Sequence, residues 1–166
     1  MVNVIIESGM SFVCENTFYI EKSETYTSMS EGVRSVEFVR VKADKLLFVE
    51  AKTSFPNPNN PCAENFERFL SEVNEIREKF IHSLSLLSSI EVGVAEECFP
   101  SDFALPSKIS LEFVLVIKNH ELRWCKQVKE KLTTTLPKYI IKIWKPTVHV
   151  INEEIAAKWN LIVVHH

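Results

Sequence analysis

The amino-acid sequence predicts an α/β protein with a mixed central β-sheet flanked by helices. Two observations support this prediction. Short runs rich in Val, Ile and Phe, typical of strands, occur on both sides of a long segment with helical periodicity. The order of segments (strands, long helix, strand, helix, strands, helix) favours layers around one sheet. At 166 residues, the chain is expected to form a single domain, residues 1–166.

Several short strands are expected before the long helix. The first is Val2–Glu7, which lacks the basic start of a signal peptide. Ser23 is placed to cap a short helix within the polar segment Ser23–Gly32. The remaining expected strands of this region are Phe12–Cys14, Phe18–Glu21, Ser35–Val41 and Leu46–Lys52, the last two joined by a tight turn at 42–45.

The longest predicted element is a helix from about Cys62 to about Ile90. Asn60 and Pro61 form a suitable N-cap and first-residue pair for it. Its apolar residues recur at spacings of three and four, which indicates one buried stripe. These residues are Phe66, Phe69, Leu70, Val73, Ile76, Phe80, Leu84 and Leu87.

After this helix we expect a long loop, Glu91–Ser107, and a strand buried on both faces, Ile109–Ile117. Asn119 is placed to cap a second helix, His120–Leu136, and Asn152 to cap a last short helix ending at Trp159. Three further strands are expected, namely Tyr139–Trp144, Thr147–Ile151 and an edge strand at Leu161–Val164.

The charges are distributed unevenly along the chain. The net charge is −3, yet residues 109–166 hold nine Lys or Arg against five Asp or Glu, a local excess of +4. Between Lys118 and Lys145 there are eight basic residues and two acids. This is compatible with an anionic partner on one face, and equally with a solvated lysine-rich surface. Tyr139, Trp144 and Trp124 lie near these lysines, where they could stack on bases or pack in the core.

The composition also excludes several classes. No apolar run approaches the roughly 18 residues of a membrane-spanning helix, so no membrane partner is expected. Four cysteines without a CxxC pair favour a reduced, cytoplasmic protein. With three glycines in the chain, nucleotide-binding glycine-rich loops are absent, as is a Gly-x-Ser-x-Gly nucleophile motif.

The hairpin of Ser35–Val41 and Leu46–Lys52 carries an unusual pattern, because its second apolar run ends in Glu50-Ala51-Lys52. Alternate residues of a strand share a face, so Glu50 and Lys52 lie on one side. If the turn is a two-residue loop, Glu37 lies opposite Glu50. A shift of one residue would instead place these two glutamates on opposite faces.

Two carboxylates directly opposite each other would have Cβ atoms about 5 Å apart and would repel. A divalent cation such as Mg²⁺ or Mn²⁺ would compensate, because both ions prefer oxygen ligands. Lys52 could then hold a water molecule or a phosphate oxygen beside the metal. This constellation suits metal-assisted phosphodiester hydrolysis.

These residues resemble a known family. Glu37, a twelve-residue gap, and then Glu50-Ala51-Lys52 on an apolar strand are similar to the PD-(D/E)xK nuclease superfamily, which has the restriction-endonuclease-like fold. The resemblance implies a nuclease-like core at about 17–117 and a C-terminal α/β extension at about 118–166.

The resemblance also implies roles for individual residues. Glu37, Glu50 and Lys52 would be catalytic, and Glu37, Glu50 and the carbonyl of Ala51 would bind Mg²⁺ or Mn²⁺. The substrate would be nucleic acid.

The chain departs from the family pattern in two places. Val36-Glu37 replaces the usual Pro-Asp, and the helix that opens the core with its own glutamate is not evident. The available substitutes for that glutamate are Glu15, Glu21 and Glu31. The alternative function is therefore a catalytically inactive nuclease-like scaffold that serves as a binding or regulatory module, with self-association into a homo-oligomer left open.

Overall fold

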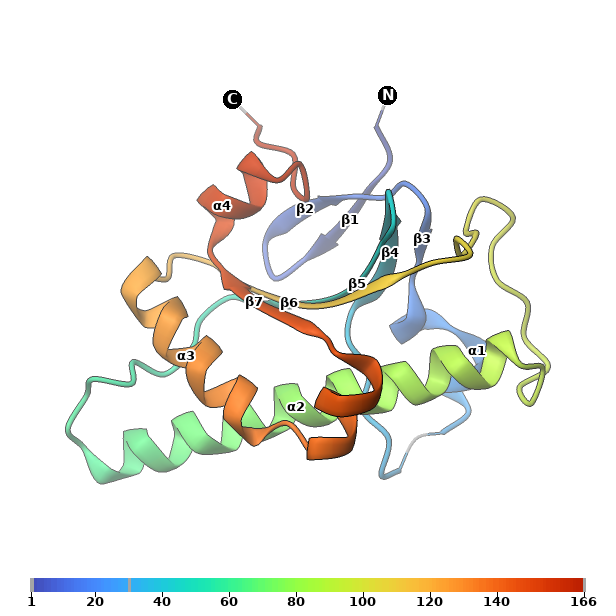
Figure 1. Cartoon of the computed structure of the whole chain (residues 1–166). Coiled ribbons are helices and arrows are strands. Elements are labelled where there is room, and N and C mark those ends of the chain that lie inside the picture. Colours follow the sequence, from blue (N-terminus) through green and yellow to red (C-terminus); the bar gives the residue numbers. More distant parts are fainter. Residues whose placement is uncertain (1, 30, 166) are drawn as a thin grey trace.

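The computed structural model describes residues 2–29 and 31–165. Its central element is a five-stranded sheet in the order β3-β4-β5-β6-β7. β3, β4 and β5 are antiparallel neighbours, whereas β5, β6 and β7 run parallel. The predicted α/β fold with a mixed sheet between helices is therefore confirmed (Figure 1). The five strands are Thr17–Phe18, Phe38–Lys42, Lys45–Lys52, Ser110–Ile117 and Thr147–Ile151.

The sheet lies between two layers (Figure 1). Helices α2 (Ala63–Glu91) and α3 (Leu122–Thr135) cover one face. The hairpin of β1 (Val4–Glu7) and β2 (Met10–Val13), together with α4 (Glu153–Lys158), covers the other. The core is accordingly divided into two apolar clusters, one on each face of the sheet. Three short helical elements complete the fold: η1 (Ile20–Lys22), α1 (Glu24–Thr27) and η2 (Ile140–Trp144).

The β4–β5 hairpin has the predicted register. Lys42 pairs with Lys45, and Val39 pairs with Phe48, so the loop contains the two residues Ala43 and Asp44. Ala43 has a φ of 55°, in the left-handed region that tight hairpin turns of this kind require. Glu37 lies one residue before β4, where its N–H still donates to the carbonyl of Val49 at 3.1 Å.

The bounds of α2 are close to those of the predicted helix, but a different residue occupies its N-cap. Cys62 occupies the N-cap, so the prediction of Asn60 as the cap was wrong. The Asn60 Oδ1 accepts instead from the Cys62 N–H at 3.0 Å. This local turn satisfies the side chain before the helix begins, a competition that is common for Asn. The predicted stripe is buried from Phe69 onward except for Leu70, which is partly buried, whereas Phe66 in the first turn is exposed.

Two caps by polar side chains are confirmed, because Ser23 and Asn152 accept from the Tyr26 and Ile155 N–H groups. Asn119 does not cap the second helix, since Glu121 occupies that position. Asn119 has a φ of 55°, a left-handed conformation that Asn tolerates better than most residues.

The expected strand Tyr139–Trp144 was wrong. This segment forms a π-helical turn, η2, in which the Lys145 N–H donates to the Ile140 carbonyl at 3.3 Å. A short apolar run cannot distinguish strand from helix by periodicity alone. The expected edge strand Leu161–Val164 is reduced to a bridge between Ile162 and Phe12.

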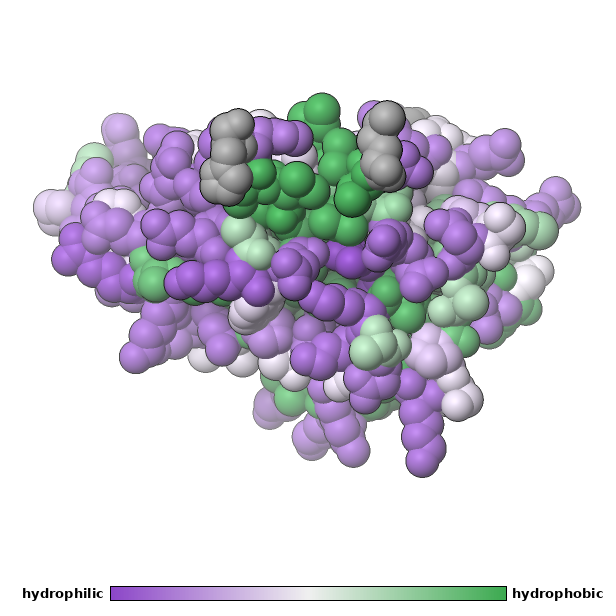
Figure 2. Space-filling model, turned by 90° about the horizontal axis from the view of Figure 1, so that it is seen from above, coloured by the Kyte–Doolittle hydropathy of each residue, from purple (hydrophilic) through white to green (hydrophobic). Residues whose placement is uncertain are grey.

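Apolar side chains are also exposed on the layer that carries β1 and β2. Figure 2 shows them gathered over this hairpin and the C-terminal segment, and they include Val4, Ile6 and Val164. No helix of the described residues is long and apolar enough to cross a membrane.

Candidate functional site

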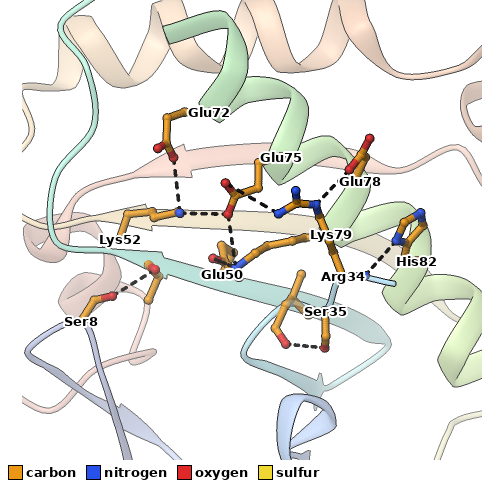
Figure 3. Close-up of polar contacts among 12 residues, drawn as sticks. Ser8, Arg34, Ser35, Glu50, Lys52, Glu72, Glu75, Glu78, Lys79 and His82 are labelled. Carbon is orange, nitrogen blue, oxygen red and sulfur yellow. Dashed lines mark hydrogen bonds and ion pairs between the residues drawn. The ribbon is translucent and has the colours of Figure 1, made fainter. Parts of the chain in front are cut away.

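Glu50 is a fully buried carboxyl at the interface between β5 and α2. Its side chain is 1% exposed, and the Lys79 ammonium of α2 donates to its Oε1 at 2.7 Å (Figure 3). Its Oε2 is buried and has no hydrogen-bond partner among the described residues. Burial raises the pKa of Glu50 to about 7, although the charges of Lys79 and Lys52 act in the opposite direction. One oxygen of this carboxyl therefore retains an unused capacity for a proton or a cation.

Glu37 lies just beyond the paired part of the hairpin, near enough to Glu50 for the charge of Glu50 to raise its pKa. It is 8% exposed, and its Oε2 is likewise buried without a partner among the described residues. The pKa of Glu37 is raised to about 9, first by burial, then by contact with Glu21 and by the charges of Glu50, Glu21 and Glu7. The carboxyl of Glu37 is therefore protonated at neutral pH unless a cation replaces the proton.

Two further glutamates complete an acidic cluster around Glu37. One carboxylate oxygen from each of Glu7, Glu21 and Glu37 lies within 4.8 Å of the others. Glu21 belongs to η1 and Glu7 ends β1, so the cluster joins both sheets. Both side chains are only half-buried, which leaves the cluster open to solvent on this side. Burial and the charge of Glu21 raise the pKa of Glu7.

Three upstream glutamates, Glu15, Glu21 and Glu31, were candidates for a further acidic residue of the site. Glu21 contacts the cluster, whereas Glu15 and Glu31 are exposed. Glu7 was not predicted from the sequence as a residue of the site. Its hairpin belongs to a separate two-stranded sheet, and no spacing in the sequence relates it to Glu37.

Lys52 lies on the same side of β5 as Glu50, as alternation in the strand predicts. Its Nζ lies 3.4 Å from carboxylate oxygens of both Glu72 and Glu75 on α2 (Figure 3). Glu75 also approaches Lys79, at 4.0 Å. Lys52 therefore directs its ammonium toward α2, yet it remains close enough to lower the pKa of Glu50.

The backbone of Ala51 is the third predicted metal ligand. Its carbonyl accepts a hydrogen bond from the Ser8 hydroxyl at 3.0 Å. A carbonyl oxygen has two lone pairs, so this contact leaves one of them available.

The donor set fits a hard divalent cation. It consists of carboxylate oxygens, two of them buried and without a partner, and one backbone carbonyl. Oxygen ligands about 2.1–2.4 Å from one ion lie at most about 5 Å apart, the scale of the separations among Glu7, Glu21 and Glu37. A cation here would offset the burial and the repulsion that raise the pKa of Glu37.

The basic residues of the predicted Lys118–Lys145 region lie along α3 and η2. Tyr139 and Trp144 are exposed there, so the alternative that these two side chains pack in the core was wrong. Trp124 lies 5.3 Å from the His120 ring, between centroids, and is half-buried. Stacking of nucleic-acid bases on these exposed aromatic side chains, beside the lysines of η2, stays a prediction.

No protein-family model matches this chain, and comparisons with curated proteins and with solved structures returned no match.

Proposed function

We propose that this protein is a metal-dependent phosphodiester hydrolase that acts on nucleic acid. One observation carries the proposal: Glu37 and Glu50, near enough for the charge of Glu50 to raise the pKa of Glu37, each bury a carboxylate oxygen that has no partner among the described residues. A buried polar atom without a partner is costly, and a bound cation is the compensation that carboxylate oxygens suit.

The topology supports the same proposal. The antiparallel series β3-β4-β5, followed by α2 and then β6 parallel to β5, has the order expected for a restriction-endonuclease-like core. In this order the Glu50-Ala51-Lys52 segment ends β5, and α2 supplies the side chains that pack on it.

In the proposed reaction, Glu37, Glu50 and the Ala51 carbonyl hold the cation. Bound Mg²⁺ or Mn²⁺ would supply Lewis acidity at the phosphate and a lower pKa for the attacking water. Glu21 and Glu7 lie at the solvent side, where a carboxylate can accept the proton of that water.

Lys52 would contact a phosphate oxygen in place of its α2 partners. Its two contacts are 3.4 Å long, weaker than charge-assisted hydrogen bonds of about 2.7–2.9 Å, so an anionic substrate can displace them. Lys79 would keep its bond to Glu50 and hold this carboxyl in orientation.

The test is cleavage of plasmid DNA and of RNA with Mg²⁺ or Mn²⁺, combined with calorimetric titration of Mn²⁺. Glu50→Gln should abolish both binding and cleavage. Lys52→Ala should keep cation binding and lower the cleavage rate about hundredfold or more. Glu78→Gln is the matched control, because Glu78 lies on α2 but pairs with Arg34 at the surface. Absence of Mn²⁺ binding, together with no cleavage above Glu50→Gln, would reject the proposal.

A second candidate, an inactive scaffold that serves as a binding or regulatory module, is favoured by the internal contacts of the site. Lys79 pairs with Glu50, Lys52 pairs with two glutamates of α2, and Ser8 binds the Ala51 carbonyl. Nucleic-acid binding in a gel-shift assay without cation-dependent cleavage would identify this second function.

A further inference from the structure

A cavity of about 370 Å³ lies on the face of the sheet opposite Glu50. It is bounded by the β4–β5 turn, by β6 and β7, and by the end of α4. This volume falls within the range of about 300–1,000 Å³ typical of small-molecule sites. The residues that define its chemistry are Lys42, Lys45, Leu47, Glu112, His149 and Trp159.

Basic side chains dominate the charge of this cavity. Lys42 donates through Nζ to the carbonyl of Trp159, and Arg40 beside it donates to the carbonyl of Asn160 at 3.2 Å. Burial and the charges of Arg40 and Lys45 lower the pKa of Lys42. Lys42 uses one of its three donors in this bond, so it can still bind an anion. An anionic group is therefore the complementary ligand at the mouth of the cavity.

A single buried carboxylate faces these cations. The Glu112 side chain, on β6, is 10% exposed. Its Oε1 lies 3.5 Å from both the Lys45 Nζ and the His149 Nε2. Both separations exceed a charge-assisted hydrogen bond of about 2.7–2.9 Å. The carboxylate can therefore accept a shorter hydrogen bond from an N–H group of a ligand.

An aromatic wall closes the cavity on the side of α4. The indole of Trp159 meets the His149 ring edge-to-face, at 5.0 Å between centroids and 83° between planes. Trp159 is 36% exposed, so part of its surface is free for a planar ring. Stacking of a base on an aromatic side chain contributes about 1–3 kcal/mol.

We propose that this cavity binds a nucleotide, with the base against Trp159, a base N–H donating to Glu112, and the phosphate at Lys42 and Lys45. The three features required (a stacking surface, a buried acceptor and a pair of cations) occur together in one cavity. The cavity shares no residue with the proposed cation site, so the two proposals can be tested separately.

The test is calorimetric titration of the full chain with GMP and AMP in the presence of EDTA. Trp159→Leu should weaken binding about tenfold to hundredfold. Lys42→Gln should weaken it about tenfold, since it removes a charged donor. Trp144→Leu is the matched control, because Trp144 is an exposed tryptophan of η2 outside the cavity. Thermal unfolding of each variant verifies that it is folded.

Three ligand controls identify what is recognised. Inorganic phosphate alone and guanosine alone should each bind more weakly than GMP. A short oligonucleotide tests whether the same cavity accepts the end of a strand, and it should lose affinity in Lys42→Gln if it does. The proposal is overturned if neither nucleotide binds at millimolar concentration, if phosphate binds as well as GMP, or if Trp144→Leu weakens binding as much as Trp159→Leu does.

Discussion

The two ends of the β4–β5 hairpin have opposite imbalances of charge. At its open end, Glu37 meets Glu7 and Glu21, and Glu50 nearby is bonded to the Lys79 ammonium. At its turn, Lys42 and Lys45 line the cavity that contains the buried carboxylate of Glu112. One short hairpin therefore gathers acidic side chains at one end and basic side chains at the other.

The two ends of the hairpin differ also in the length and burial of their ion pairs. Lys79 and Glu50 form a 2.7 Å ion pair with the carboxylate 1% exposed, whereas Lys45 is about half exposed and lies 3.5 Å from Glu112. Burial of charge without full pairing is costly at both ends. Four predictions test this comparison.

The largest expected effect is on stability. Glu50→Ala should lower the free energy of unfolding by about 3–5 kcal/mol, because it leaves the Lys79 ammonium buried without its closest partner. Urea denaturation measures this change. Glu78→Ala removes an exposed ion pair of the same helix and should cost less than about 1 kcal/mol. Equal losses in the two variants would show that burial does not distinguish these pairs.

The second prediction concerns cation affinity. Glu37→Gln should weaken Mn²⁺ binding about hundredfold, since it removes a buried ligand oxygen from the acidic cluster. Titration calorimetry measures the affinity. Glu15→Gln provides the control, because Glu15 is an exposed acid that does not contact the cluster. Unchanged affinity in Glu37→Gln would remove Glu37 from the site.

The third prediction concerns pH. Folding raises the pKa of Glu37 from 4.5 to about 9, so the folded state binds more protons than the unfolded state between these values. Without a cation, stability should therefore fall as pH rises through this window, by up to about 1.4 kcal/mol per pH unit. The pKa of Glu50 is raised to about 7, so Glu50 also contributes to the loss of stability as pH rises toward that value.

Glu37→Gln should remove much of this slope, as measured by thermal unfolding between pH 5 and pH 9 in EDTA. With Mn²⁺ present the trend should be weaker, because metal binding displaces the proton. A wild-type slope of the opposite sign would contradict the raised pKa of Glu37.

The smallest expected effect is at the turn. Lys45→Gln should change the free energy of unfolding by less than about 1 kcal/mol, because its ion pair is exposed and long. Urea denaturation measures the change beside that of Glu50→Ala. A loss as large as that of Glu50→Ala would mean that both ends of the hairpin are equally important for stability.

Much of the hairpin could be predicted from local rules. A four-residue turn segment between two apolar runs implied the register of Val39 with Phe48, which the structure has, and brought Glu37 near Glu50. Ser23 and Asn152 were recognisable caps for the same reason, since a cap depends on a few neighbouring residues.

Other features escaped such rules. The strand expected at Tyr139–Trp144 is a π-helical turn, because a short apolar run is compatible with either conformation. The cavity with Glu112 and Trp159 was not predicted, since β6, β7 and α4 meet only in the folded chain.

The amino-acid pattern alone thus settled the layered α/β architecture, the pairing of β4 with β5 and the alternation that puts Glu50 and Lys52 on one side. These depend on interactions between neighbouring residues. The tertiary structure decided which groups surround them: Lys79 on Glu50, the glutamates of α2 on Lys52, and Glu7 beside Glu37. The raised pKa values of Glu50, Glu37 and Glu7 follow from burial and from charges far apart in the sequence, which no local pattern records.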